Sequence, residues 1–113
     1  MKEQQNQRQE KELKVGVEKY LSVSTVHITQ EDCQKLSWPQ EDLPIQVVAH
    51  ENGWWIAVYD EQMLKEDVFP CMRVYGYSEA FINVIIMASK TNCLWINLDY
   101  NGYLVEGLGF CDW

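Results

Sequence analysis

The chain has 113 residues, which suffice for one hydrophobic core and one domain. Its apolar content of 47% is ordinary for a globular protein, and it contains no run of 18 apolar residues that would form a membrane-spanning helix. The net charge of −8 disfavours direct binding to DNA or RNA, because a phosphate backbone attracts a basic surface.

The charge is unevenly distributed along the sequence. Residues 1–20 carry five basic and four acidic side chains, whereas residues 21–113 carry four basic and thirteen acidic ones. This acidic body favours a basic protein as the partner. The alternative interpretation is that the acidity only maintains solubility.

The N-terminal region differs in composition from the rest. Residues 1–12 are polar, rich in Gln and Glu, and lack Gly and Pro, which predicts a flexible or loosely helical segment. We expect residues 13–113 to form a single α+β domain. The apolar positions of residues 13–21 fit a weak helical period and predict an N-terminal helix there. The charged start lacks the apolar stretch of a signal peptide, so the expected location is cytoplasmic.

Two capped helices are predicted. Thr29 precedes Glu31 and Asp32, an N-cap followed by acidic residues that the helix dipole favours, and this helix is expected to end near Ser37. Ser78 caps the second, over residues 79–91, whose apolar residues cover most of its circumference. A helix of this kind is buried on more than one side or contacts another subunit. Residues 60–77 between them are the least regular part and are expected to form a docked loop, a short helical turn or an element of their own.

Asn-Gly pairs predict two β-hairpins, because both turn residues of the favoured two-residue loop need positive φ. The first hairpin joins residues 45–50 to residues 54–59 around Asn52-Gly53, with His50 opposite Trp55. The second joins residues 94–100 to residues 103–106 around Asn101-Gly102. With a further strand at residues 22–28, the predicted fold is α+β in the order α-β-α-β-β-α-β-β. Its mainly antiparallel sheet has about five strands, and the helices pack on one side.

Aromatic side chains are the strongest functional signal. Trp54 and Trp55 are adjacent on a strand, so they point to opposite faces, and the predicted pairing turns Trp55 away from the core. Trp95 lies on the wetter face of the second hairpin, and neighbouring hairpins would place both indoles on one exposed surface with an acidic rim. Trp and Tyr are enriched at interaction hot spots. The alternative is that the N-terminal helix covers this surface. The candidate binding residues are His50, Trp55, Tyr59, Trp95, Asp99 and Glu106.

Catalytic and cofactor signatures are weak. The four cysteines are spaced 38, 22 and 18 residues apart without a CxxC pair, so neither zinc nor a disulfide framework is expected. No phosphate-binding glycine loop is present. Asp99, Glu106 and Asp112 leave open a carboxylate site for metal or acid/base chemistry. We expect no catalytic residue, no metal and no cofactor.

Three segments together resemble the DUF5983 family, a bacterial family of unknown function. They are Ser24–Thr29 with the acidic helix start after it, the strand Gly53–Val58, and the ending with Leu98-Asp99, Val105–Leu108 and Asp112-Trp113. The resemblance covers roughly residues 22–113. It implies no activity, and it implies a setting on plasmids, prophages and other mobile elements.

The first functional hypothesis is a non-enzymatic protein-interaction module of a mobile genetic element. The partner would be a protein, a basic one if charge matters, with a homodimer left open. Nucleic acid and membrane are not expected as direct partners. The alternative hypothesis is an acidic mimic of nucleic acid that inhibits a host defence nuclease, which requires acids spaced along one face as phosphates are. A small hydrolase using Asp99, Glu106 or His27 is the enzymatic alternative.

Overall fold

A single mixed β-sheet with helices on one side forms the body of the protein. The computed structural model describes residues 16–38 and 45–112. In these residues the sheet has four strands in the order β1-β4-β3-β2. They are β1 (Tyr20–Ser24), β2 (Val47–His50), β3 (Gly53–Ala57) and β4 (Trp95–Asp99). The α+β class is confirmed. The prediction of about five mainly antiparallel strands is wrong, because β1 runs parallel to β4.

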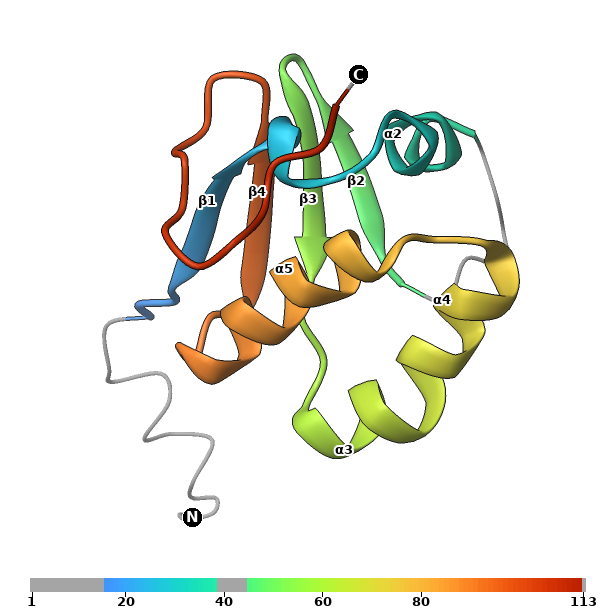
Figure 1. Cartoon of the computed structure of the whole chain (residues 1–113). Coiled ribbons are helices and arrows are strands. Elements are labelled where there is room, and N and C mark those ends of the chain that lie inside the picture. Colours follow the sequence, from blue (N-terminus) through green and yellow to red (C-terminus); the bar gives the residue numbers. More distant parts are fainter. Residues whose placement is uncertain (1–15, 39–44, 113) are drawn as a thin grey trace, which may run out of the picture.

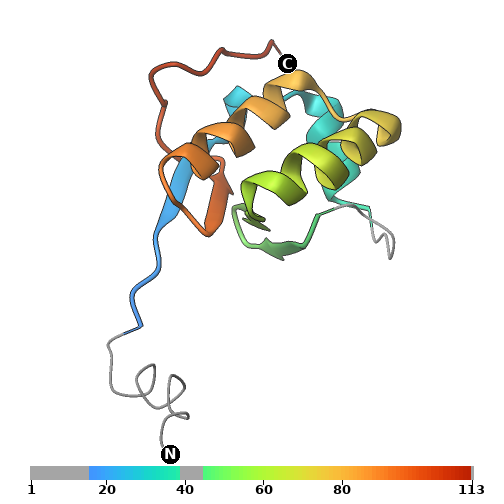
Figure 2. The same ribbon diagram turned by 90° about the horizontal axis from the view of Figure 1, so that it is seen from below.

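Cross-strand register divides the sheet into two faces. Opposite residues on paired strands share a face, so Ile56 of β3 lies with Ile96 of β4 and Val47 of β2, while Trp54 lies with Leu98. This face carries the buried core and meets the helices. Figures 1 and 2 show the helices of the described residues on this side of the sheet.

Helix α5 (Glu79–Lys90) packs on the core face of the sheet, as its sequence predicts. The Ser78 hydroxyl accepts a hydrogen bond from the Phe81 N–H at 3.1 Å, which confirms the predicted N-cap. Five side chains of the helix are buried: Phe81, Ile82, Val84, Ile85 and Ala88. The buried residues include neighbours in sequence as well as residues three apart, because apolar side chains cover most of the circumference of this helix.

Residues 61–75 are helical throughout. Helix α3 (Glu61–Met63) passes into a π-helical turn, η2 (Leu64–Val68), and then into α4 (Phe69–Tyr75). Pro70 lies in the first turn of α4, directly after the π-helical turn, in which the Phe69 N–H bonds to the Leu64 carbonyl. The expectation of a largely irregular segment is therefore wrong, and the alternative of an element of its own is correct.

Helix α2 (Gln30–Leu36) begins with the predicted cap. The Thr29 hydroxyl accepts from the Asp32 N–H and the Asp32 carboxylate accepts from the Thr29 N–H, both at 3.0 Å. This reciprocal capping box satisfies two of the free N–H groups at the helix start. Asp32 is fully buried and its two oxygens also accept from the N–H and hydroxyl of Ser78, which joins the starts of α2 and α5.

The predicted N-terminal helix over residues 13–21 is wrong where the structure describes it. Residues 16–19 have no regular secondary structure, and β1 begins at Tyr20. Residues 20–24 alternate between the faces of the sheet, and this period of two overrides a weak helical period. After Ser24 the chain forms a short 3₁₀ turn, η1 (Thr25–His27), so the strand predicted over residues 22–28 is shorter and lies earlier. The predicted flexible segment 1–12 lies outside the described residues.

The first hairpin exists, but its turn is displaced by one residue. His50 pairs with Gly53 and Val48 pairs with Trp55, so the turn residues are Glu51 and Asn52 rather than Asn52 and Gly53. Gly53 belongs to the strand. An added Cβ at Gly53 would lie 1.8 Å from the carbonyl oxygen of Leu98, so close approach of β3 to β4 requires glycine there.

The second predicted hairpin is absent. Strand β4 has β1 on one side and β3 on the other, so neither of its edges is free to pair with a returning strand. The chain turns at Tyr100-Asn101, where the Gly102 N–H bonds to the Asp99 carbonyl at 2.9 Å, and leaves the sheet as an irregular segment from Tyr103 to Asp112. Gly102 passes against β1, where an added Cβ would lie 2.5 Å from the carbonyl carbon and oxygen of Val23.

His27 holds this C-terminal segment against the body. Its Nδ1 lies 2.7 Å from the Gly109 carbonyl oxygen, and its Nε2 accepts a hydrogen bond from the Val105 N–H at 2.9 Å. Nδ1 must therefore carry the proton and Nε2 must be free of one. The Phe110 ring stacks on the imidazole at 5.2 Å, and the Cys111 N–H bonds to the Val26 carbonyl.

We expect His27→Leu to release the C-terminal segment. The change removes an acceptor from the Val105 N–H and a donor from the Gly109 carbonyl, at a cost of about 1–3 kcal/mol in the free energy of unfolding. Amide hydrogen exchange should accelerate at Val105 and Cys111. His50→Leu, the matched change at the other histidine, should leave both amides protected. Unchanged exchange at Val105 in the His27 variant would contradict this account.

Candidate functional site

The side of the sheet that faces away from the helices is the candidate site, and we call it the open face. Register places Tyr20, Trp95 and Ala57 in one row across it, and Asn97, Trp55 and Val48 in the next. Tyr20 is 55% exposed and Val48 is 48% exposed, while both indoles are half-buried. Among the described residues no helix packs against this surface (Figure 1).

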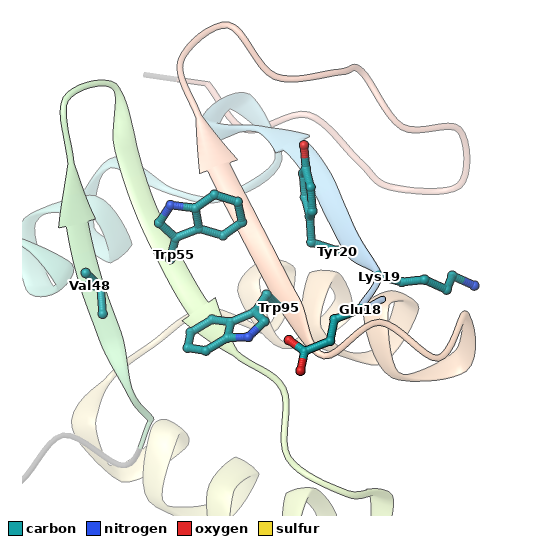
Figure 3. A pocket seen from close by; sticks show the side chains of 6 residues that line it. All are labelled: Glu18, Lys19, Tyr20, Val48, Trp55 and Trp95. Carbon is teal, nitrogen blue, oxygen red and sulfur yellow. The ribbon is translucent and has the colours of Figure 1, made fainter. Parts of the chain in front are cut away.

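A shallow hollow of about 380 Å³ lies in the open face. Figure 3 shows the side chains that line it: Glu18, Lys19, Tyr20, Val48, Trp55 and Trp95. The rings of Tyr20 and Trp55 meet edge to face, with centroids 5.1 Å apart and planes at 80°. Edge-to-face packing places the positive edge of one ring on the negative face of the other, and this pair orders the aromatic wall of the hollow.

A polar pair supports Trp55 from its other side. His50 Nε2 lies 2.7 Å from Asn97 Oδ1, and the His50 ring is tilted against the Trp55 ring with centroids 5.9 Å apart. His50 Nδ1 accepts from the Asn52 N–H at 3.1 Å. Nε2 therefore carries the proton that is donated to Asn97, and the imidazole is engaged on both nitrogens.

Four of the six predicted binding residues lie on the open face, and three of them lie together there. Trp55 and Trp95 share the hollow, and His50 packs beside Trp55. Asp99 lies on the same face at the end of β4, but its Oδ1 accepts from the Asn101 N–H at 2.7 Å and so shapes the turn. Neither Asp99 nor Glu106 lines the hollow, and its acidic lining residue is Glu18, which the sequence did not single out.

Tyr59 and Glu106 do not join the open face. Tyr59 lies beyond the end of β3, packs against the core cluster, and accepts the Gln46 N–H at its hydroxyl, at 3.1 Å. Glu106 was predicted on a strand paired with β4, and it lies exposed on the irregular C-terminal segment instead. Their predicted places on this face were wrong: β3 ends at Ala57, before Tyr59, and β4 has no free edge for the strand on which Glu106 was expected.

Sequence reasoning missed Tyr20 and Val48. Tyr20 was predicted to lie in a helix, although the alternation of residues 20–24 is a strand signal. The parallel pairing of β1 with β4 places Tyr20 opposite Trp95. Val48 alternates with His50 and so falls on the Trp55 face in the predicted register too, but it was not singled out. The displaced turn places it directly opposite Trp55.

Titratable groups outside the open face are the other features that could carry chemistry. Across residues 16–38 and 45–112, no group of three or more His, Cys, Asp or Glu side chains is placed to hold a metal ion. The four cysteines are free thiols. Burial, with a contribution from the Asp32 charge, raises the pKa of Cys33 to about 12, which keeps its thiol protonated and unreactive at neutral pH.

Tyr77 belongs to the same buried region as Asp32. Burial raises the pKa of the Tyr77 hydroxyl to about 12, with smaller contributions from the charges of Asp32 and Tyr75. Its hydroxyl oxygen is buried and has no hydrogen-bond partner among the described residues. The group therefore remains a neutral phenol at physiological pH and packs against Phe81, with ring centroids 5.5 Å apart.

These features define a small α+β domain whose one sheet has a helix-covered core face and an open aromatic face. Residues 20–113 match the family model described as the C-terminal domain of a family of unknown function, DUF5983. The chain belongs to this family, as its sequence motifs indicate. No curated protein and no solved structure matches the chain. In the described part of the chain, no helix combines the length and apolarity needed to cross a membrane.

Proposed function

We propose that this protein is a non-enzymatic protein-interaction module that binds its partner through the open face. The observation that carries the proposal is the aromatic hollow formed by Tyr20, Trp55 and Trp95 on the side of the sheet without helices. Large aromatic side chains with partial exposure are enriched where proteins bind other proteins. An ordinary solvent-facing sheet surface has no structural need for two indoles.

The partner chemistry and the biological setting extend this proposal. The acidic body favours a basic protein as the partner. The chain belongs to DUF5983, and the setting that this resemblance implies favours a role on a bacterial mobile element in the cytoplasm. The nucleic-acid-mimic alternative is less well supported. A mimic needs carboxylates in a row along one surface, whereas the hollow is lined by aromatic and aliphatic side chains with Glu18 at its edge.

We expect Trp55→Ala and Trp95→Ala each to abolish capture of the partner from a lysate of the organism that encodes the chain. Removing a central aromatic side chain from an interface typically costs about 2 kcal/mol or more, a thirtyfold loss in affinity. The measurement is quantitative mass spectrometry of material bound to the immobilised chain.

Matched controls are available on surfaces outside the open face. Trp38 is 57% exposed after helix α2, and Tyr103 is 74% exposed on the C-terminal segment. Trp38→Ala and Tyr103→Ala should retain the same captured protein. The proposal is wrong if the open-face variants and the control variants retain it equally. Retention by all four, together with loss at raised salt, would instead favour the acidic mimic.

A further inference from the structure

We propose that the hollow in the open face is an aromatic cage for a cationic side chain, and that its occupant is an arginine of a basic partner protein. This inference rests on the proposed function and names the chemical group that the open face would recognise. It is carried by the arrangement of three aromatic rings around one hollow, by the carboxylate at the edge, and by Lys19, whose ammonium is held outside the hollow.

The three rings come from three different strands. Tyr20 is on β1, Trp55 is on β3, and Trp95 is on β4 between them. The planes of Tyr20 and Trp55 meet at 80°, which forms a corner, and Figure 3 shows Trp95 closing a further side of the same hollow. A cation within about 6 Å of such ring faces is attracted by their quadrupoles, most strongly by Trp.

The charges at the rim favour a cation. Figure 3 shows the Glu18 carboxylate beside Trp95, while Lys19 extends away from the rings. The Lys19 ammonium donates to the Thr91 carbonyl at 2.7 Å, at the end of α5, and this contact holds its charge outside the hollow. The exposed Glu18 carboxylate at the edge would pair with a cationic group in the hollow, whereas an apolar group would leave this charge without a partner.

Arginine fits these features better than lysine does. Its planar guanidinium stacks on an aromatic face and simultaneously presents a fork of N–H donors to a carboxylate. Lysine offers a compact, strongly hydrated charge that stacks less well. The overall field agrees in sign, since residues 21–113 carry thirteen acidic and four basic side chains.

The test is a titration of the full chain with a short blocked peptide, Gly-Arg-Gly-Arg-Gly, followed by the NMR shifts of the indole N–H groups of Trp55 and Trp95. The matched probe replaces each arginine with citrulline, which has nearly the same shape and no charge. We expect the arginine peptide to shift both indoles and to bind at least fivefold more tightly than the citrulline peptide. A lysine peptide should bind more weakly than the arginine peptide.

Variants locate the binding within the hollow. Trp55→Leu, Trp95→Leu and Glu18→Gln should each weaken binding of the arginine peptide about fivefold or more. Trp38→Leu and Glu31→Gln alter an indole and a carboxylate at or beside α2, and they should bind the peptide as the unmodified chain does.

The outcomes separate this inference from the proposed function. Equal binding of the arginine and citrulline peptides, or no binding of either, overturns the cationic occupant. If Trp55→Ala still abolishes capture of the natural partner in that case, the proposed interaction face stands and only its ligand chemistry is wrong. If Trp55→Ala has no effect on capture, both are wrong.

Discussion

Gly53→Ala is expected to lower the free energy of unfolding by at least about 3 kcal/mol. An alanine Cβ at this position would lie 1.8 Å from the Leu98 carbonyl oxygen and 2.8 Å from its carbonyl carbon. Both atoms belong to the backbone of β4, so no side chain can move aside. Relief requires β3 to separate from β4, and those two strands form the centre of the sheet. The φ of Gly53, +157°, adds backbone strain for any L side chain.

Urea unfolding followed by far-UV circular dichroism measures this effect. Gly109→Ala is the matched control, because no atom lies within 4 Å of the Cβ position there. The control should remain within about 0.5 kcal/mol of the unmodified chain. If Gly53→Ala and Gly109→Ala unfold at the same urea concentration, the close approach of β3 to β4 described above is incorrect.

Asp32→Ala is expected to be similarly costly, at about 3–5 kcal/mol. The Asp32 carboxylate is fully buried and accepts hydrogen bonds from the Thr29 N–H, the Ser78 N–H and the Ser78 hydroxyl. Removing it leaves these donors unpaired in the interior, opens a cavity, and removes the hydrogen bonds that connect the starts of α2 and α5. Because small domains are stable by only about 5–15 kcal/mol, the variant should be partly unfolded near 37 °C.

Glu31→Ala provides the comparison for Asp32→Ala. Glu31 lies in the same first turn of α2 and is exposed, so its interaction with the helix dipole is worth about 0.3–1 kcal/mol. Thermal unfolding should therefore separate the two variants by at least about 2 kcal/mol. Similar melting temperatures for both would show that the buried hydrogen bonds of Asp32 contribute little.

Local signals in the sequence predicted helices α2 and α5 well. The caps at Thr29 and Ser78 are short-range hydrogen bonds between residues three apart, so their geometry depends little on the rest of the fold. Helix α5 was also recognisable from its apolar circumference. The helical segment around Pro70 was not, because a proline in a first helical turn has the same local sequence as a proline that breaks a helix.

The hairpins were predicted poorly, and both Asn-Gly pairs show why. Gly53 and Gly102 are each required by close approach to a backbone distant in sequence, Leu98 for the first and Val23 for the second, rather than by a two-residue turn. The turn statistics for Asn-Gly contain no information about such contacts. The parallel pairing of β1 with β4 joins residues about 75 positions apart, and it removes the edge that the second hairpin needed.

The candidate site was predicted only in part, because some of its residues are brought together by pairing between strands that are distant in sequence. Alternation along the strands correctly turned Trp55 and Trp95 away from the core and onto one surface. Tyr20 and Glu18 reach that surface only through the parallel strand, which no local pattern indicated. Glu106 was included because a strand was predicted where the chain leaves the sheet.

Hydroxyl-radical footprinting of the free chain and of its partner complex tests the central claim most directly. The claim is that the partner covers the open face. Tyr20, Trp55 and Trp95 should be oxidised in the free chain and protected in the complex, while Trp38 and Tyr103 should be oxidised equally in both. Protection confined to Trp38 or Tyr103, with the open face oxidised as before, would contradict the account.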